Sequence, residues 1–310
     1  MSKYPIKKEF FPFNHLKPPI NKAFLKTVVP LISRPPRAFY KDKLLSVKRC
    51  EVESFDGEKI ECFLLSPKEG SGKAPCLIYI HGGGFVLPAA GYHYKNAMHY
   101  AKETGCKVWF INYRLAPKYT SPVFFEDCYA AVCYLYGNAK SLGVDPDEIA
   151  IGGDSAGATL SAGVCMMAKD RKHPMRFRFQ MLPYPFLDMR GESDSNKKYT
   201  DTPMWNSTLS QRIGPIIQVD KSKPSYVYHS PVEAESFEWL PPAYIETAEF
   251  DCLHDDGILY AELLRGAGIA VEVNETKGTI HGFDIKQKAP TTLEALSARV
   301  AFMRKMFGKN

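Results

Sequence analysis

The feature that most constrains the fold of this chain is the segment Gly-Asp-Ser-Ala-Gly at 153–157. An apolar run at 148–152 precedes it, and small residues typical of a helix follow it. This G-x-S-x-G pattern is typical of a sharp strand-to-helix turn, in which small neighbours let the strand and the helix approach each other. The pattern therefore predicts that Ser155 lies at the tip of a strained turn. The residues expected to support that turn are Gly153, Asp154 and Gly157.

The rest of the chain alternates between strand-like and helix-like segments. Such alternation predicts a mostly parallel central sheet with helices on both faces. A hairpin is expected earlier, from Cys50 to Phe63, because two β-like runs flank the turn signal Asp56-Gly57. The expected strands lie at about 60–65, 76–80, 106–111, 148–152, 177–183, 243–248 and 270–275, and the expected helices at about 93–104, 123–140, 156–169, 256–266 and 291–306.

A nucleophilic serine needs a base to take its proton and donors to stabilise the oxyanion. The segment His81-Gly82-Gly83-Gly84 follows a buried-strand pattern, and its three glycines leave backbone N–H donors unshielded by side chains. The N–H groups of Gly83 and Gly84, with that of Ala156, are the candidate oxyanion donors. A tight turn that only needs positive φ is the alternative. A phosphate-binding loop is disfavoured, because no lysine follows at P-loop spacing and G-x-G-x-x-G is absent.

Four histidines lie beyond the serine, where the base of such a site is expected. His281 follows a strand-like run, and a loop at the carboxyl end of a strand is where an open α/β sheet places reacting groups. His254 is better explained as a surface histidine at a helix N-terminus. His173 lies in a charged stretch and His229 in a polar, proline-bearing segment. The sequence therefore favours His281 as the base.

Three aspartates are candidates for the acid that orients the base. Asp251 comes directly after a strand-like run, whereas Asp255 and Asp256 begin the next expected helix. Acidic residues in a first helical turn are explained by capping and the helix dipole. Asp251 lacks that explanation, so it is the predicted acid, which would hold the imidazole tautomer and stabilise the imidazolium.

Five motifs in this order resemble the hormone-sensitive-lipase-like branch of the α/β-hydrolase carboxylesterases. They spread over the expected core, at 81–84, 113–117, 153–157, 249–253 and 281–283. The resemblance implies an α/β-hydrolase fold with a helical cap. It assigns Ser155 as nucleophile, His281 as base, Asp251 as acid, and Gly83, Gly84 and Ala156 as oxyanion donors. The chain departs from the family pattern at Lys118, Ala158, Thr159, Cys252 and His254.

The expected activity is therefore that of a serine carboxylesterase acting on short- to medium-chain acyl esters through an acyl-enzyme, with no metal or cofactor. The same groups also suit a carbohydrate or aryl deacetylase or an amidase, because a triad does not specify the leaving group. A small-molecule-binding protein on a catalytically dead hydrolase fold is a further alternative. The complete Ser, Asp and His set argues against it, because a receptor does not need all of them.

Two segments do not fit the alternation and are predicted to form a cap. Residues 1–45 carry ten Lys or Arg against two acidic residues, which gives +8 in a chain whose total is +6. Membrane-surface attachment is the alternative to a cap for such a basic segment. The predicted division is 1–45 as the N-terminal cap segment, 187–230 as a cap insertion, and 46–186 with 231–310 as the catalytic core. An apolar stripe within the first segment would place Ile20, Phe24, Val28 and Ile32 on one helix face.

Composition limits the remaining options. No apolar run approaches 18 residues and the N-terminus lacks a hydrophobic signal core, so we expect a cytoplasmic protein without a membrane span. The eight cysteines show neither CxxC pairs nor metal-ligand spacing, which favours reduced thiols. We expect a small-molecule ester as the partner and no nucleic acid, and a homo-oligomer is left open.

Overall fold

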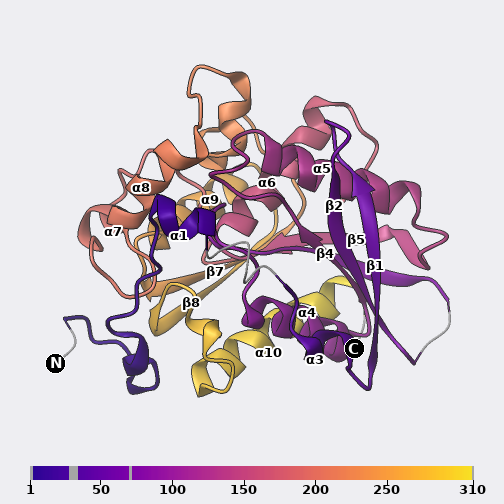
Figure 1. The fold of residues 1–310 in the computed structure, drawn as a ribbon, viewed down its shortest axis with the longest axis horizontal. Helices are drawn as coiled ribbons and strands as arrows, with labels where there is room; N and C mark the ends of the chain where they lie inside the picture. Colours follow the sequence, from indigo (N-terminus) through magenta and orange to yellow (C-terminus); the bar gives the residue numbers. More distant parts are fainter. Residues whose placement is uncertain (1–2, 28–33, 70–71, 309–310) are drawn as a thin grey trace.

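The computed structural model describes residues 3–27, 34–69 and 72–308. Within them, eight strands form one sheet in the order β1-β2-β4-β3-β5-β6-β7-β8 (Figure 1). β2 is antiparallel to both β1 and β4, and all other neighbours are parallel. The strands are β1 (Leu45–Glu53), β2 (Lys59–Pro67), β3 (Ala74–Ile80), β4 (Lys107–Asn112), β5 (Val144–Gly153), β6 (Gln180–Pro183), β7 (Ala243–Phe250) and β8 (Val271–Ile280).

Helices cover both faces of this sheet. One face carries α3, α4 and α10, and the opposite face carries α5, α6 and α9 (Figure 1). The α-helices are α1 (Lys22–Thr27), α3 (Arg37–Tyr40), α4 (Gly91–Thr104), α5 (Val123–Gly137), α6 (Ala156–Asp170), α7 (Asp194–Lys198), α8 (Ser207–Ile217), α9 (His254–Gly266) and α10 (Pro290–Met306). Short 3-10 helices are η1 (Lys8–Phe13), η2 (Pro224–Tyr228), η3 (Pro231–Glu233) and η4 (Phe283–Ile285).

Strand β3 shows why the sheet is buried on both faces. Successive side chains of a strand point to opposite faces. Cys76, Ile78 and Ile80 join the apolar core on the α5–α6–α9 side. Leu77 and Tyr79 join the core on the α4–α10 side. A strand that is apolar at every position therefore fits the middle of a sheet covered by helices on both sides.

The predicted mostly parallel sheet with helices on both faces is confirmed. The predicted hairpin is also confirmed, since Cys50 lies opposite Cys62 in an antiparallel pair. The expected end of the last strand was wrong. β8 runs on to Ile280 because its pairing with β7 continues to Phe250. Helix α9 also begins two residues earlier than expected, at His254.

The N-terminal segment is only partly the expected amphipathic helix. Within the described residues, α1 is six residues long, with Leu25 and the preceding Ile20 buried and Phe24 half-buried. The other two residues of the predicted stripe, Val28 and Ile32, lie outside the described residues.

The segment before α1 packs against the core and the insertion. Phe10 is completely buried beside Phe283, with ring centroids 6.0 Å apart. The Met204 N–H donates to the Leu16 carbonyl at 2.7 Å, and Tyr4 donates its hydroxyl proton to Asp201. The two regions predicted to form a cap therefore contact each other.

Two further features concern the helices and the cysteines. Among the described residues, no helix combines the length and the apolar character needed to cross a membrane. Each of the eight cysteines is a free thiol.

Candidate active site

Ser155 lies on the turn between β5 and α6. Its φ of 55° is in the left-handed region, which costs a non-glycine residue energy. The turn is tight because the helix starts directly against β3. A Cβ atom on Gly153 or on Gly157 would collide with the carbonyl oxygen of Ile80. Glycine is therefore required at both positions, as the sequence pattern predicts.

The structure brings Ser155, His281 and Asp251 together in one hydrogen-bonded row. His281 Nε2 lies 2.9 Å from Ser155 Oγ, and His281 Nδ1 lies 2.6 Å from Asp251 Oδ2. Asp251 is fully buried, and its other oxygen accepts the N–H of Leu253 at 3.0 Å. Because Nδ1 faces a carboxylate, it is the protonated nitrogen, which leaves Nε2 free to accept the serine proton.

Each of the three side chains follows the carboxyl end of a strand, and these three ends lie at the same edge of the sheet. Ser155 follows β5, Asp251 follows β7 and His281 follows β8. Parallel strands end at the same edge, so residues 126 positions apart in the chain meet there. Tyr184 follows β6, and its ring packs edge-on against His281 with centroids 5.0 Å apart.

The glycine loop after β3 faces the same site. Gly83 and Gly84 have φ values of 114° and 61°, which only glycine adopts without strain. A Cβ atom on Gly84 would lie 2.8 Å from Trp205. Within the described part of the chain, the N–H groups of Gly83, Gly84 and Ala156 donate to no protein acceptor. Such unpaired donors are rare in a protein interior, and they are available to an anionic oxygen.

Asp154 anchors the serine turn through a buried network. Its carboxylate accepts the Tyr79 hydroxyl at 2.7 Å and lies 3.0 Å from His93 Nε2. His93 Nδ1 accepts the Ala90 N–H, so Nε2 carries the proton and donates to Asp154. Burial would raise the pKa of Asp154, but the His93 interaction and these hydrogen bonds outweigh it and lower the pKa to about 2. His93 and Tyr79 were missed by sequence reasoning, because nothing local links them to position 154.

Asp154→Asn is expected to destabilise the protein by about 2 kcal/mol at pH 7, the free energy equivalent of the lowered pKa of this buried carboxyl. A lowered folded-state pKa stabilises above the unfolded-state pKa. The contribution is therefore lost as pH falls from about 4 towards 2. Urea unfolding at pH 7 and pH 3 measures this, with Asp147→Asn on the exposed part of β5 as control. An unchanged cost at pH 3 would contradict the assignment.

His81 lies at the start of the glycine loop. Its ring is completely buried and stacks on Tyr113 with centroids 4.4 Å apart. Nδ1 lies 2.7 Å from the Gly82 carbonyl oxygen, and the Tyr113 hydroxyl donates to the His81 carbonyl. Burial and the neighbouring His93 lower the pKa of His81 to about 3, so the ring is neutral at physiological pH. Its effect is to fix the start of the glycine loop.

A pocket of about 240 Å³ opens onto Ser155 and His281. Its walls combine the glycine loop with residues from the N-terminal segment and the insertion, which are apolar except for Lys17. Sequence reasoning assigned both regions to the cap but did not identify which of their residues form the walls, because the lining comes from five separate parts of the chain. The wall residues from outside the core are Leu16, Lys17, Pro18, Pro19, Met204 and Trp205.

Other residues near the site differ from their expected roles. Asp256 is not a solvent-exposed charge at a helix end. It is buried, and burial together with Asp188 raises the pKa of Asp256 well above its usual value. His229 is also buried, with Nε2 2.8 Å from the Ser121 hydroxyl. His254 is half-buried, and its hydrogen-bond partners are Asp255 and Glu275, not Ser155.

No group of three or more His, Cys, Asp or Glu side chains in the described residues is arranged to hold a metal ion.

The strand order, the serine turn and the row of Ser, His and Asp define an α/β hydrolase. Comparison with known families agrees, because a family described as having the alpha/beta hydrolase fold matches residues 77–285. The chain belongs to this family, and within it to the hormone-sensitive-lipase-like carboxylesterases.

Several relatives of known name are esterases. The chain is 34% identical over 213 residues to esterase LipI of Mycobacterium tuberculosis. The aligned region covers 68% of this chain and 66% of that protein. It is 33% identical to carboxylesterase NlhH of the same species, over 74% of this chain and 73% of that protein. The chain thus spans about two thirds to three quarters of the length of these relatives.

Solved structures agree over nearly the whole chain. A bacterial heroin esterase is 31% identical with a TM-score of 0.80, over 92% of this chain and 90% of that one. An esterase of Pyrobaculum calidifontis is 31% identical with a TM-score of 0.81, over 91% and 93%. The similarity therefore covers about nine tenths of this chain.

Proposed function

We propose that this protein is a carboxylic ester hydrolase that works through an acyl-enzyme on Ser155. The observation that carries the proposal is the row of contacts from Ser155 Oγ through His281 to the buried Asp251. It adjoins a pocket whose size and apolar walls suit a small ester. The named relatives, which are esterases, support the same class of reaction.

In the first half of the reaction, His281 Nε2 removes the Ser155 proton as the oxygen attacks the ester carbonyl. Asp251 stabilises the imidazolium that forms. The negative charge on the former carbonyl oxygen is stabilised by the unpaired N–H groups of Gly83, Gly84 and Ala156. His281 then gives its proton to the leaving alcohol, and the acyl group stays on the serine.

In the second half, water takes the place of the alcohol. His281 removes a proton from the water as it attacks the acyl carbonyl, and the same donors stabilise the second oxyanion. Collapse of this intermediate breaks the bond to Ser155 Oγ, which recovers its proton from the imidazolium and releases the carboxylic acid.

The pocket favours short acyl groups. Its volume of about 240 Å³ lies below the range of about 300–1,000 Å³ that is usual for small-molecule sites. Trp205 and Ile213 lie against Gly84, so the insertion forms a roof directly above the proposed oxyanion donors. We propose that residues 1–45 and 187–230 together act as the cap that limits acyl length.

Initial rates on aryl esters of increasing acyl length test the reaction class. Aryl amides and acetylated sugars in the same assay test the amidase and deacetylase alternatives. Covalent labelling of Ser155 by an aryl fluorophosphonate, located by peptide mass spectrometry, tests the nucleophile independently of any ester. A protein that binds these compounds without labelling or hydrolysis would instead be a receptor on this fold.

Trp205→Ala is expected to shift the preference towards longer acyl groups. The indole roofs the pocket, with its ring centroid 6.0 Å from that of His281. Removing it gives room for at least two more methylenes, each worth about 0.8 kcal/mol when buried, so the octanoyl-to-acetyl ratio of kcat/KM should rise at least about tenfold.

The matched control is Trp239→Ala. This tryptophan is half-buried, lies beside Lys169 and does not line the catalytic pocket. Its loss should leave the acyl-length ratio unchanged. An equal shift in both variants would show that the effect is general loosening of the fold, and no shift in Trp205→Ala would refute its role as a roof.

A further inference from the structure

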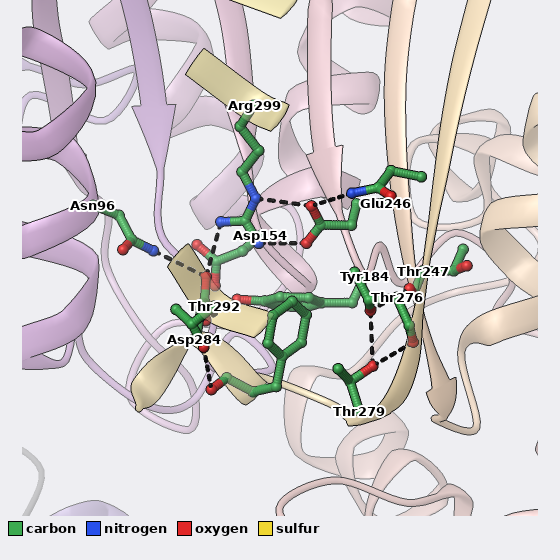
Figure 2. A network of polar contacts seen from close by, with 12 residues as sticks. Asn96, Asp154, Tyr184, Glu246, Thr247, Thr276, Thr279, Asp284, Thr292 and Arg299 are labelled. Carbon is green, nitrogen blue, oxygen red and sulfur yellow. Dashed lines mark hydrogen bonds and ion pairs between the residues drawn. The ribbon is translucent and has the colours of Figure 1, made fainter. Parts of the chain in front are cut away.

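A second buried network lies beneath the proposed active site and is centred on Arg299 of α10 (Figure 2). The guanidinium is completely buried and forms ion pairs with two carboxylates, Glu246 and Asp284, which are also completely buried. Its Nη1 lies 2.9 Å from Asp284 Oδ2 and 3.0 Å from the Tyr100 hydroxyl. One arginine thus joins two segments that are distant in the sequence.

Each of these segments carries a proposed catalytic residue a few positions away. Glu246 is on β7, the strand that leads directly into Asp251. Asp284 is in η4, the single turn that follows His281. Arg299 therefore ties together the strand that leads to the acid and the turn that follows the base.

Asp284 also reaches His281 through a side chain. Its Oδ1 accepts the Tyr184 hydroxyl at 2.6 Å, and the Tyr184 ring packs edge-on against the His281 imidazole. Its Oδ2 accepts from Asn96 at 3.0 Å as well as from Arg299. Tyr184 is held in a left-handed conformation, with φ of 34°, so its backbone is strained in the position that meets the histidine.

Stability alone does not explain a buried network of this kind. Moving one cation and two carboxylates out of water carries a large desolvation penalty, and packed apolar side chains often stabilise a core equally well. The guanidinium fork, by contrast, fixes direction, because its planar N–H groups bind two carboxylates in set orientations. The cluster is therefore suited to fixing the relative orientation of the segments that carry the two carboxylates.

We propose that Arg299, Asp284 and Tyr184 are positioning residues that hold the His281 imidazole in line between Ser155 and Asp251. Arg299 fixes the Asp284 turn relative to β7, and Asp284 fixes the Tyr184 ring against the imidazole. None of the three is expected to touch the substrate. This inference rests on the proposed esterase function, since it assumes that His281 is the base.

The test combines Asp284→Asn, Tyr184→Phe and their double variant. Each removes the charge or the hydroxyl while nearly preserving shape. A mispositioned base lowers the rate of proton transfer without removing binding contacts. We therefore expect kcat on an acetyl aryl ester to fall about 10- to 100-fold in Asp284→Asn, with KM within about twofold. The rate of Ser155 labelling by the fluorophosphonate should fall in parallel.

The double variant distinguishes a chain of contacts from two separate effects. If Asp284 acts through Tyr184, the fold-losses in kcat should be less than multiplicative, because both changes break one link. Tyr184→Phe keeps the ring against His281 and loses only the hydroxyl. If Asp284→Asn does not fold, the kcat of Tyr184→Phe is therefore the measurement that tests the inference.

Asp127→Asn is the matched control for loss of a buried ion pair. Asp127 is completely buried and pairs with Arg114, and it does not contact His281. It should lower the urea midpoint without lowering kcat. Unchanged kcat in a folded Asp284→Asn would overturn this inference and leave the proposed function standing. A loss of kcat in Asp127→Asn equal to that in Asp284→Asn would do the same. A wild-type protein that neither hydrolyses esters nor is labelled at Ser155 would overturn the proposed function and this inference together.

Discussion

Replacing Ser155 with alanine is expected to lower kcat for aryl ester hydrolysis by about 10⁶-fold, by analogy with other Ser-His-Asp enzymes in which the members of the triad act as one unit. The change removes Oγ, the atom proposed to attack the ester, which lies 2.9 Å from His281 Nε2. What remains is binding in the pocket and the backbone donors, which provide a small residual acceleration over water.

The fold should be unaffected, because the hydroxyl is replaced by a hydrogen at a site that alanine fits. The turn strain stays the same, since both residues carry a Cβ atom at positive φ. Purified protein should therefore show the wild-type urea midpoint, no product burst and no fluorophosphonate adduct. Ser161→Ala is the matched control, because this buried hydroxyl of α6 donates to the Gly157 carbonyl. Activity of Ser155→Ala within tenfold of wild type would end the nucleophile assignment.

Asp251→Asn should reduce kcat by about 10⁴-fold. The carboxylate accepts a hydrogen bond from His281 Nδ1 at 2.6 Å and is completely buried. An asparagine amide in its place can donate to Nδ1, which shifts the imidazole proton to Nε2. That nitrogen then cannot accept the serine proton. The loss should appear in kcat, and KM should change little, because Asp251 does not line the pocket.

Asp255→Asn separates this effect from general damage to the same loop. Asp255 is four residues away and contacts the Ser195 N–H and His254, not His281. Its replacement should cost stability and leave kcat within a few-fold of wild type. The opposite pattern, with Asp255→Asn inactive and Asp251→Asn active, would mean that the acid has been assigned four residues too early.

Sequence reasoning was most successful where short segments determine local geometry. The serine turn needs glycine at positions 153 and 157 because the helix starts against the Ile80 carbonyl. The five-residue motif at 153–157 already indicates this requirement. The parallel sheet follows from the alternation of elements, and the meeting of Ser155 with Asp251 and His281 follows from where parallel strands end. These inferences need no knowledge of the packing between distant residues.

Sequence reasoning was weaker where a residue's role depends on burial. Asp256 looks like an ordinary first-turn acid, yet it is buried beside Asp188, with its pKa raised. The end of β8 was placed too early, because the segment before Ile280 is mostly polar or glycine and is held by pairing with β7. Burial and pairing are set by neighbours from other elements, so a local pattern cannot report them.

The sequence by itself determined the class of fold and the chemical groups at its centre, because local sterics and the order of elements leave few alternatives. Only the tertiary structure decided what surrounds them. The His93 partner of Asp154, the Trp205 roof and the Arg299 network all join segments tens to hundreds of residues apart. Contacts of that kind arise when the whole core closes, so they have no signature in any one stretch of the chain.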